Sequence, residues 1–308
     1  MYNMYDGYLV FRKIKEETSL RNKITLSFLL VFSLIFPSLS FADAAPGDVI
    51  ITLGQDLTET QKETILNEMN APENPQIVVV TNEEEHQYLG QYIPKARIGN
   101  KALSSASITI GEKGSGLDVT ITEHITLITE EMYANALITA GVKDAKIFVT
   151  GPGNVSGTAA LTGIIKAYEV SSDKAIPEEV KQIANEEMVE TTKLSEKIGA
   201  EDAAALMAKI KDEIAKNAPK NDEELRTIIV NAANDLGITL TDADITRLME
   251  LFNKLLELNI DWNQVGEQLN LAKEKLTNFL ESEEGQSFLD KLKEFFVNLI
   301  DAIKGLFK

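Results

Sequence analysis

The sequence predicts an α+β protein, in which an α/β-layered amino-terminal domain with a mixed sheet is followed by an all-α helical bundle domain. The first observation is the distribution of glycine, since 13 of the 18 glycines precede Ser172. The second is the hydrophobic pattern. Short apolar runs alternate with helical stretches in the first half, whereas apolar residues recur at spacings of three and four throughout the second. These patterns place a leader at residues 1–42, the α/β domain at residues 43–172 and the bundle at residues 173–308.

The start of the chain is typical of a secretory signal peptide. A basic stretch precedes an apolar run at residues 24–36, which is too short to cross a bilayer core of about 30 Å as a helix. Pro37 ends this run, and the small residues Ser40 and Ala42 follow. We expect cleavage after Ala42, with cleavage after Ala44 or a retained anchor as the alternatives. The mature protein is then expected to be secreted or extracytoplasmic, with no integral membrane span.

Charge and cysteine content exclude several functions. The chain has 48 acidic and 30 basic residues and a net charge of −18, and removing the leader, with five basic and three acidic residues, takes it to −20. Such a surface repels nucleic acids, so we expect no nucleic-acid partner. The chain has no cysteine, which excludes disulfides, thiol catalysis and thiolate metal sites. Stability must therefore come from a sizeable hydrophobic core.

The first strand and helix are predicted near the start of the α/β domain. Residues 48–54, DVIITLG, form a short apolar run that Gly54 ends. The stretch LTETQKETILNEMN at residues 57–70 follows, with Thr58 and Gln61 three residues apart. This spacing predicts a capping box, in which each side chain bonds the backbone N–H of the other residue.

A second strand and helix come next. PQIVVVTN at residues 75–82 is a continuous apolar run, which predicts a strand buried on both faces. Asn82 is the predicted cap of the next helix, and Gly90 ends that helix. Residues 83–85 are three glutamates in its first turn, which we interpret as a solvated, dipole-favouring turn rather than a Ca²⁺ site.

The remainder of the domain alternates strand and helix signals. Apolar and polar residues alternate on both sides of a glycine-rich turn within residues 107–122, which predicts an antiparallel hairpin. Thr129 is the predicted cap of a helix that ends at Gly141, and a strand follows at residues 146–151. A helix over about residues 157–169 closes the domain.

The second half is predicted to be helical throughout. The polar stretch at residues 170–179 is the expected seam between the two domains. Gly237 and the sequence Thr241 to Asp244 mark one helix end and the next start. Short connections predict an antiparallel bundle. The helical stretches are residues 206–218, 225–237, 245–258, 262–280 and 288–307.

A glycine-rich loop before the closing helix is the first candidate site. Its spacing fails the phosphate-binding P-loop, because Thr158 stands where lysine should follow glycine, and it also fails the dinucleotide fingerprint and the nucleophile elbow. Two interpretations stay open: an anion or carbonyl site at the helix N-terminus, or a tight turn where glycine permits close packing. The candidate ligand-binding residues are Gly151, Gly153, Asn154, Ser156, Gly157 and Thr158.

Histidine chemistry gives no further candidate. His86 and His124 are the only histidines, and neither has a partner at metal-ligand spacing. We therefore expect no metal site and no cofactor, with His86 solvated on its helix and His124 at a strand end.

The last predicted helix carries a broad apolar stripe that includes Phe295, Leu299 and Ile303. Its polar face mixes lysine with aspartate and glutamate, which favours a buried bundle helix over a membrane-surface helix. The alternative is a surface that docks a partner or a membrane, with these three residues as its candidates.

Five ordered stretches carry a resemblance to a known family: EEEHQYLGQYI, IGNKALSSASITI, GSGLDVTITEHIT, EEMYANALITAGVKDAKIFV and VSGTAALTGIIKAYE. They resemble the YpuA-like exported proteins of Gram-positive bacteria, the DUF1002 family, over roughly residues 47–169, and the resemblance extends more loosely through the helical half. One departure is FVTGPGN, where the family is expected to be more apolar. The resemblance implies export and a connection with the cell envelope, and brings no catalytic residues.

Two functions follow as hypotheses. The first is an exported, non-enzymatic protein of the cell envelope that binds a wall component or another exported protein. The alternative is an extracellular hydrolase that uses carboxylates such as Glu123 or Glu130 near the Ser156 loop, because paired carboxylates suffice for glycoside hydrolysis. The sequence defines neither the ligand nor the oligomeric state.

Overall fold

A computed structural model describes residues 45–172 and 175–282. The predicted signal peptide and the predicted final helix lie outside the described residues, and so do Phe295, Leu299 and Ile303. Across the described ranges, no helix is both long and apolar enough to cross a bilayer.

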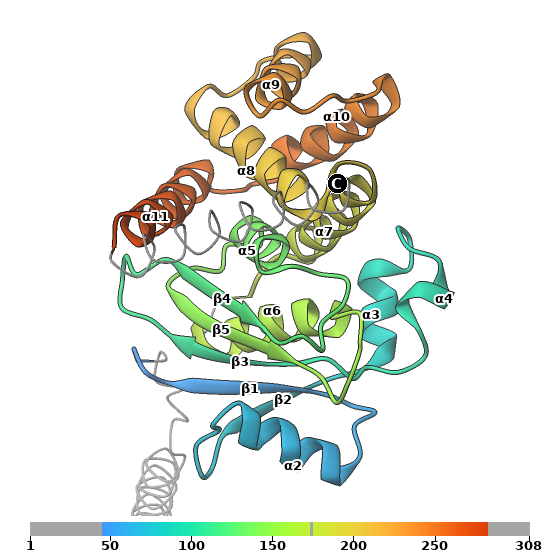
Figure 1. The fold of residues 1–308 in the computed structure, drawn as a ribbon, viewed down its shortest axis with the longest axis vertical. Coiled ribbons are helices and arrows are strands. Elements are labelled where there is room, and N and C mark those ends of the chain that lie inside the picture. Colours follow the sequence, from blue (N-terminus) through green and yellow to red (C-terminus); the bar gives the residue numbers. More distant parts are fainter. Residues whose placement is uncertain (1–44, 173–174, 283–308) are drawn as a thin grey trace, which may run out of the picture. The chain divides into compact units, whose positions relative to one another are not determined.

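The first half of the described chain contains a five-stranded mixed sheet in the order β2-β1-β3-β5-β4 (Figure 1). β1 and β2 run parallel, as do β4 and β5, whereas β3 is antiparallel to both of its neighbours. The predicted mixed sheet is therefore confirmed. The strands are β1 (Val49–Gly54), β2 (Gln76–Val80), β3 (Ser105–Ile110), β4 (Leu117–Ile121) and β5 (Ala145–Thr150).

The predicted hairpin between β3 and β4 is wrong, because β5 lies between these strands. Ile147 of β5 pairs with Ile108 on one side and with Val119 on the other. The glycine-rich connection is held open instead of closing tightly, since the backbone N–H groups of Gly114 and Gly116 both donate to Asp144 Oδ1, at 3.1 and 2.9 Å. Asp144 lies just before β5, so these hydrogen bonds tie the connection between β3 and β4 to the start of β5. β5 occupies the position between β3 and β4 where the sequence predicted that these two strands pair directly.

Five helices belong to this half, and three of them begin at a threonine cap whose side chain accepts from a backbone N–H. Thr58 and Gln61 form the predicted capping box. The predicted cap Asn82 is one residue late, because the neighbouring Thr81 accepts from the Glu84 N–H and forms its own capping box. The helices are α2 (Glu59–Glu68), α3 (Asn82–Leu89), α4 (Lys95–Ile98), α5 (Glu130–Thr139) and α6 (Thr158–Ser172).

The sheet is covered on both faces. Consecutive residues of a strand point to opposite faces, so Ile50 belongs to one core cluster and Ile51 to another. The larger cluster contains Leu161 of α6 and Tyr133 of α5, and the smaller contains Ile65 of α2. Figure 1 shows α2 on one side of the strands and α5 on the other.

The second half is helical, as predicted, with Thr241 and Asp244 in a capping box at the start of α10. A core cluster of its own contains Met207, Leu248 and Phe252. The helices are α7 (Glu178–Ile198), α8 (Ala200–Lys216), α9 (Asp222–Asp235), α10 (Asp242–Glu257) and α11 (Trp262–Glu281).

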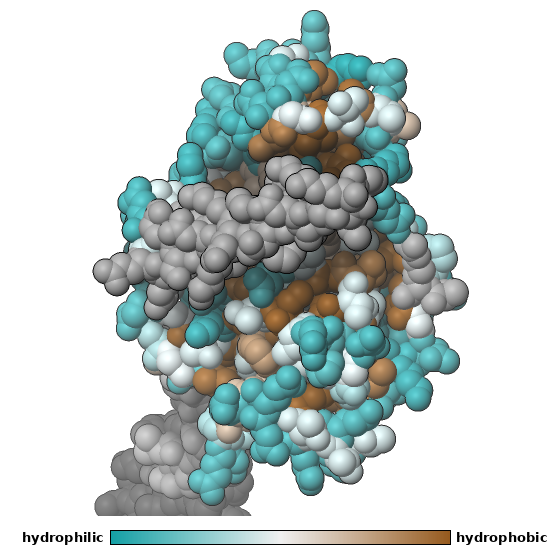
Figure 2. All heavy atoms as spheres, viewed as in Figure 1, coloured by the Kyte–Doolittle hydropathy of each residue, from teal (hydrophilic) through white to brown (hydrophobic). Residues whose placement is uncertain are grey.

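The larger core cluster also includes residues of this helical half, because Met188 of α7 and Ala204 of α8 pack with the residues that cover the sheet. The boundary between residues 172 and 173 stays a prediction. On the face drawn in Figure 2, hydrophilic residues cover the outer parts of the helical half, and hydrophobic residues show in separate areas of the helical half and of the sheet half.

Candidate functional site

The glycine-rich loop at residues 151–157 joins the end of β5 to the start of α6. Val155 ties it to the segment before α5, because its N–H donates to the His124 carbonyl at 2.9 Å and its carbonyl accepts from the Thr126 N–H at 2.9 Å. These two hydrogen bonds form an isolated parallel bridge between Ile125 and Val155. The loop therefore has a fixed position above the ends of two parallel strands.

Gly157 meets two requirements that only glycine satisfies. Its φ of +96° lies in the left-handed region, and a Cβ would stand 2.4 Å from Tyr133 Oη and 2.8 Å from Ile125 Cγ2. The Tyr133 hydroxyl donates to the Gly157 carbonyl at 2.5 Å, so the close approach is also a hydrogen bond. Burial raises the pKa of Tyr133, which keeps this hydroxyl a donor.

The other loop residues differ in their surroundings. A Cβ at Gly151 would stand 2.5 Å from Val155 Cγ2, whereas a Cβ at Gly153 would meet open space although its φ is +149°. Asn154 is exposed at the tip of the loop. The ligand-binding role predicted for Gly151, Gly153 and Asn154 stays a prediction.

Ser156 and Thr158 belong to a chain of hydrogen bonds that ends at a buried carboxylate. Ser156 Oγ and Thr158 Oγ1 are 3.0 Å apart, and Thr158 Oγ1 donates to Glu85 Oε1 at 2.9 Å. The other carboxylate oxygen of Glu85 accepts from Asn82 Nδ2 at 3.0 Å. The structure thus connects the predicted loop to α3, 73 residues earlier in the chain.

Sequence reasoning missed Glu85, which was interpreted as part of a solvated turn. The residue is 2 % exposed, so that interpretation is wrong for this glutamate. A signal was present, because Tyr88 and Leu89 follow at spacings of three and four and are buried on the same helix face. Burial raises the pKa of Glu85 and the charge of Asp56 adds to this, while hydrogen bonds from Asn82 and Thr158 partly oppose it.

A cavity of about 280 Å³ lies beside this chain of hydrogen bonds. Ser104 contributes a second hydroxyl, whose Oγ accepts from the Ala160 N–H at 3.0 Å. Ser156 Oγ accepts in the same way from the Thr158 N–H at 3.4 Å. Two serines therefore occupy N–H groups in the first turn of α6. The cavity is lined by Glu85, Ile98, Gly99, Asn100, Lys101, Leu103, Ser104, Val155 and Ser156.

The carboxylates named for the hydrolase hypothesis lie elsewhere. Glu130 Oε1 accepts from the Ile121 N–H at 3.0 Å, Glu123 is exposed, and neither lines the cavity. Of the described carboxylates, the one hydrogen-bonded to the loop hydroxyls is Glu85.

The histidines lie on separate elements. His86 is half-buried rather than solvated, with its Nε2 3.0 Å from the Gly99 carbonyl and its Nδ1 buried without a partner among the described residues. His124 contributes its carbonyl to the loop contact. Within the described part of the chain, no three His, Asp or Glu side chains form a group that could hold a metal ion.

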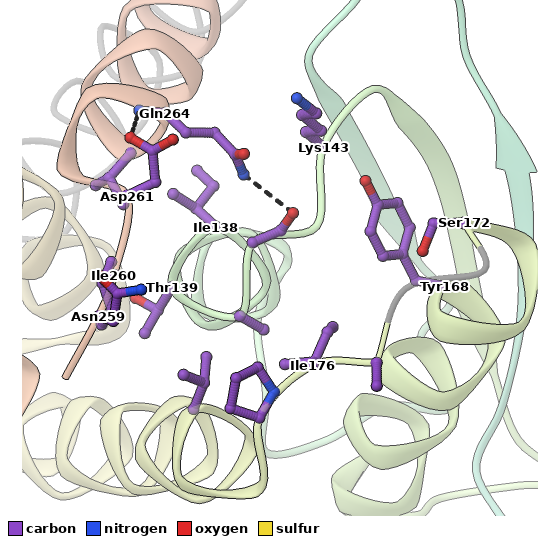
Figure 3. A pocket seen from close by; sticks show the side chains of 16 residues that line it. Ile138, Thr139, Lys143, Tyr168, Ser172, Ile176, Asn259, Ile260, Asp261 and Gln264 are labelled. Carbon is purple, nitrogen blue, oxygen red and sulfur yellow. Dashed lines mark hydrogen bonds between the residues drawn. The ribbon is translucent and has the colours of Figure 1, made fainter.

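A second cavity, of about 290 Å³, lies among the ends of α5 and α6 and the start of α11 (Figure 3). Gln264 Nε2 donates across it to the Gly141 carbonyl at 3.0 Å. The Tyr168 ring borders it, and burial raises the pKa of that hydroxyl. Lys143 and Asp261 supply one charge of each sign to the lining.

Behind this cavity lies a buried ion pair. Thr139 lines the cavity and donates through its hydroxyl to Glu187. Lys211 Nζ donates to Glu187 Oε1 at 2.7 Å and to the Asn135 carbonyl at 2.8 Å. Burial lowers the pKa of Lys211, while the charge of Glu187 opposes this effect. The pair joins α5, α7 and α8.

The fold and the site define a class of protein in which a layered α/β half is joined to a helical half, with a cavity lined in part by Ser104 and Ser156 at the loop between β5 and α6. The family model described as "Protein of unknown function (DUF1002)" matches residues 53–272, and the chain belongs to this family. It is 57 % identical over 279 residues to "Uncharacterized protein YpuA" of Bacillus subtilis (strain 168), which covers 90 % of this chain and 96 % of that protein. No solved structure matches the chain. The matched range includes both cavities.

Proposed function

We propose that the protein is an exported, non-enzymatic protein of the cell envelope that binds a wall component or another exported protein. The observation that carries this proposal is the position of the predicted cleavage site. The compact unit that holds all described residues begins at Asp43, directly after the expected cleavage at Ala42. Removal of the leader would therefore leave this unit whole, as a secretory signal peptide requires.

The loop cavity supports binding rather than catalysis. Its lining offers hydroxyl, amide and carboxyl groups, but its described residues include no histidine and only one carboxylate, Glu85. The Ser156 hydroxyl lies against Thr158 rather than against a general base. Ordered polar groups without such a partner are typical of recognition.

Fractionation of the native host tests the proposal. We expect a mature protein that begins at Asp43 or Ala45, recovered with the envelope and retained by insoluble envelope material after purification. A variant without residues 1–42 should stay in the cytoplasm and yet bind the same material in vitro. Full-length protein in the cytoplasm, or no retention by envelope material, would contradict the proposal.

A hydrolase is the second candidate function, and the buried carboxyl of Glu85 is the observation that favours it. A raised pKa is what a general acid needs near neutral pH. Incubation with purified wall glycan distinguishes the two functions. Under our proposal, the parent protein releases no reducing ends. Release that disappears in Glu85→Gln would instead establish the hydrolase.

A further inference from the structure

The hydrogen bonds around the loop cavity assign a donor or acceptor role to each hydroxyl. When Glu85 is ionised, its carboxylate can only accept hydrogen bonds, so the Thr158 hydroxyl must donate to Glu85 Oε1. Thr158 Oγ1 must then accept from Ser156 Oγ. Ser156 also accepts from the Thr158 N–H, which leaves it one lone pair for the cavity. Ser156 therefore presents an acceptor.

Ser104 presents the opposite character. Its Oγ accepts from the Ala160 N–H, and the described part of the chain offers no acceptor for its own proton. The residue is 3 % exposed overall and lines the same cavity, so this proton is available to an occupant. A donor at Ser104 and an acceptor at Ser156 together match a ligand that both accepts and donates hydrogen bonds.

We propose that this cavity binds one ring of a neutral, polyhydroxylated ligand, a sugar unit, through hydroxyls that accept from Ser104 and donate to Ser156. This inference rests on the proposed function and narrows its wall component to a carbohydrate. A cavity of about 280 Å³ is near the lower end of small-molecule sites, which start at about 300 Å³, and so suits a single ring. Ile98, Leu103 and Val155 add apolar lining for the C–H faces of the ring.

Charge disfavours an anionic occupant. Two N–H groups in the first turn of α6, those of Thr158 and Ala160, already donate to Ser156 and Ser104 and are not free to cradle an anion. Glu85 lies within the lining, while Lys101, the one cation among the lining residues that the structure describes, is exposed. A neutral hydroxyl avoids the cost of bringing a second negative charge next to Glu85.

Protonation of Glu85 reverses the chain. Asn82 Nδ2 donates to Oε2, so an added proton sits on Oε1, and the protonated carboxyl donates a hydrogen bond to Thr158 Oγ1. Thr158 then donates to Ser156, which turns its own proton toward the cavity. Among the described residues, the charged or titratable groups that act on Glu85 are His86 on the same helix, Asp56 after β1 and Tyr133 on α5. Glu85→Gln fixes the reversed state, because its amide N–H₂ can donate to Thr158.

Titrations followed by ligand-observed NMR test the assignment, with methyl glucoside, its fully O-methylated ether and inorganic phosphate as probes. We expect the parent protein to bind methyl glucoside and neither other probe. Ser104→Ala and Ser156→Ala should each weaken that binding at least about fivefold, as for the loss of one hydrogen bond. Ser195→Ala is the matched control and should change nothing, since Ser195 lies on α7 and donates to the Thr192 carbonyl.

Glu85→Gln provides the more specific outcome. It should keep methyl glucoside binding within about threefold and gain binding of the O-methylated ether, because Ser156 then donates to an oxygen that only accepts. This variant also guards against misfolding, since it removes neither serine bond to α6. Preferred binding of phosphate, absence of sugar binding, or equal binding by parent and serine variants would overturn the inference.

Retention by insoluble envelope material is measured on the same variants and separates the two proposals. If parent and serine variants are retained equally, the carbohydrate assignment is wrong while the envelope function stands. If the parent is not retained but binds methyl glucoside through Ser104 and Ser156, the envelope function is wrong and the assignment stands.

Discussion

Lys211 and Glu187 form an ion pair at 2.7 Å in which the two side chains are only 1 % and 0 % exposed. The pair joins α8 to α7, and hydrogen bonds from the Lys211 ammonium to the Asn135 carbonyl and the Thr139 hydroxyl extend it to α5. Because α5 also packs in the core that covers the sheet, one polar cluster connects the two halves of the protein.

Lys211→Met should destabilise the protein by about 3–5 kcal/mol, because it leaves the Glu187 carboxylate buried without its cation. The double variant Lys211→Met with Glu187→Leu should recover most of this loss, since two apolar side chains of similar volume need no partner. Urea unfolding measures the free energy of unfolding of the parent, the single variant and the double variant. A double variant as unstable as the single one would show that the pair contributes through packing alone.

Gly157→Val should cost about 2–5 kcal/mol, from a left-handed φ and from overpacking against Tyr133. Gly153→Ala is the control in the same loop, because its φ is also positive but a Cβ there meets open space. It should cost less. The comparison uses the free energy of unfolding, and equal losses would mean that strain rather than space decides at Gly157.

The fold class could be predicted because periodicity distinguishes helices from strands. Burial of the strand in residues 75–82 on both faces was predicted wrongly, because β2 is an edge strand whose Ile77 and Val79 are 45 % and 48 % exposed. Strand order could not be predicted, because the alternation in β3 and β4 says nothing about which strand lies beside them. They are separated because β5 pairs with both, and Asp144 before β5 accepts hydrogen bonds from Gly114 and Gly116, about 30 residues earlier in the chain. Thr81 and Asn82 are both good caps, and neighbouring residues of equal propensity leave the start of a helix uncertain by one position.

The candidate site was only partly predictable. The loop itself was found from its glycines, and Ser156 and Thr158 were named from it. Glu85 was missed because a run of three glutamates was treated as one unit, although its spacing to Tyr88 and Leu89 placed it on the buried face. The partner of a buried charge is set by tertiary packing, so a local pattern cannot supply it.

The loss of folding stability at acidic pH should depend on Asp244. Burial opposes its ionisation, but hydrogen bonds from Lys197 and Thr241 outweigh this effect and lower the pKa to about 2. A lowered folded-state pKa contributes stability that is present above the ordinary value of 3.8 and is lost as pH falls toward 2. Asp244→Asn should therefore be less stable than the parent near neutral pH, and the difference should shrink across that window. A difference that does not change with pH would contradict the assignment.

Glu85 should make the free energy of unfolding depend on pH in the opposite direction from Asp244. Its pKa is raised above 4.5, so the folded state holds its proton at pH values where the unfolded chain has lost it. Stability from this group falls as pH rises from 4.5 to the folded pKa and then levels off. Glu85→Gln removes this dependence, so unfolding free energies of variant and parent should diverge in favour of the variant across the window. Parallel curves would show that Glu85 is not perturbed.

Limited proteolysis tests the predicted boundary between the halves. The polar stretch at residues 170–179 should be cut first, because Ala175 and Pro177 are exposed between α6 and α7. The two fragments should nevertheless elute together from a sizing column, because Lys211 and the shared core hold α5 against α7 and α8. Cleavage of the Lys211→Met variant under the same conditions is the comparison, and its fragments should separate more readily. Resistance of residues 170–179 in the parent, with cuts elsewhere, would mean that the two halves form one domain.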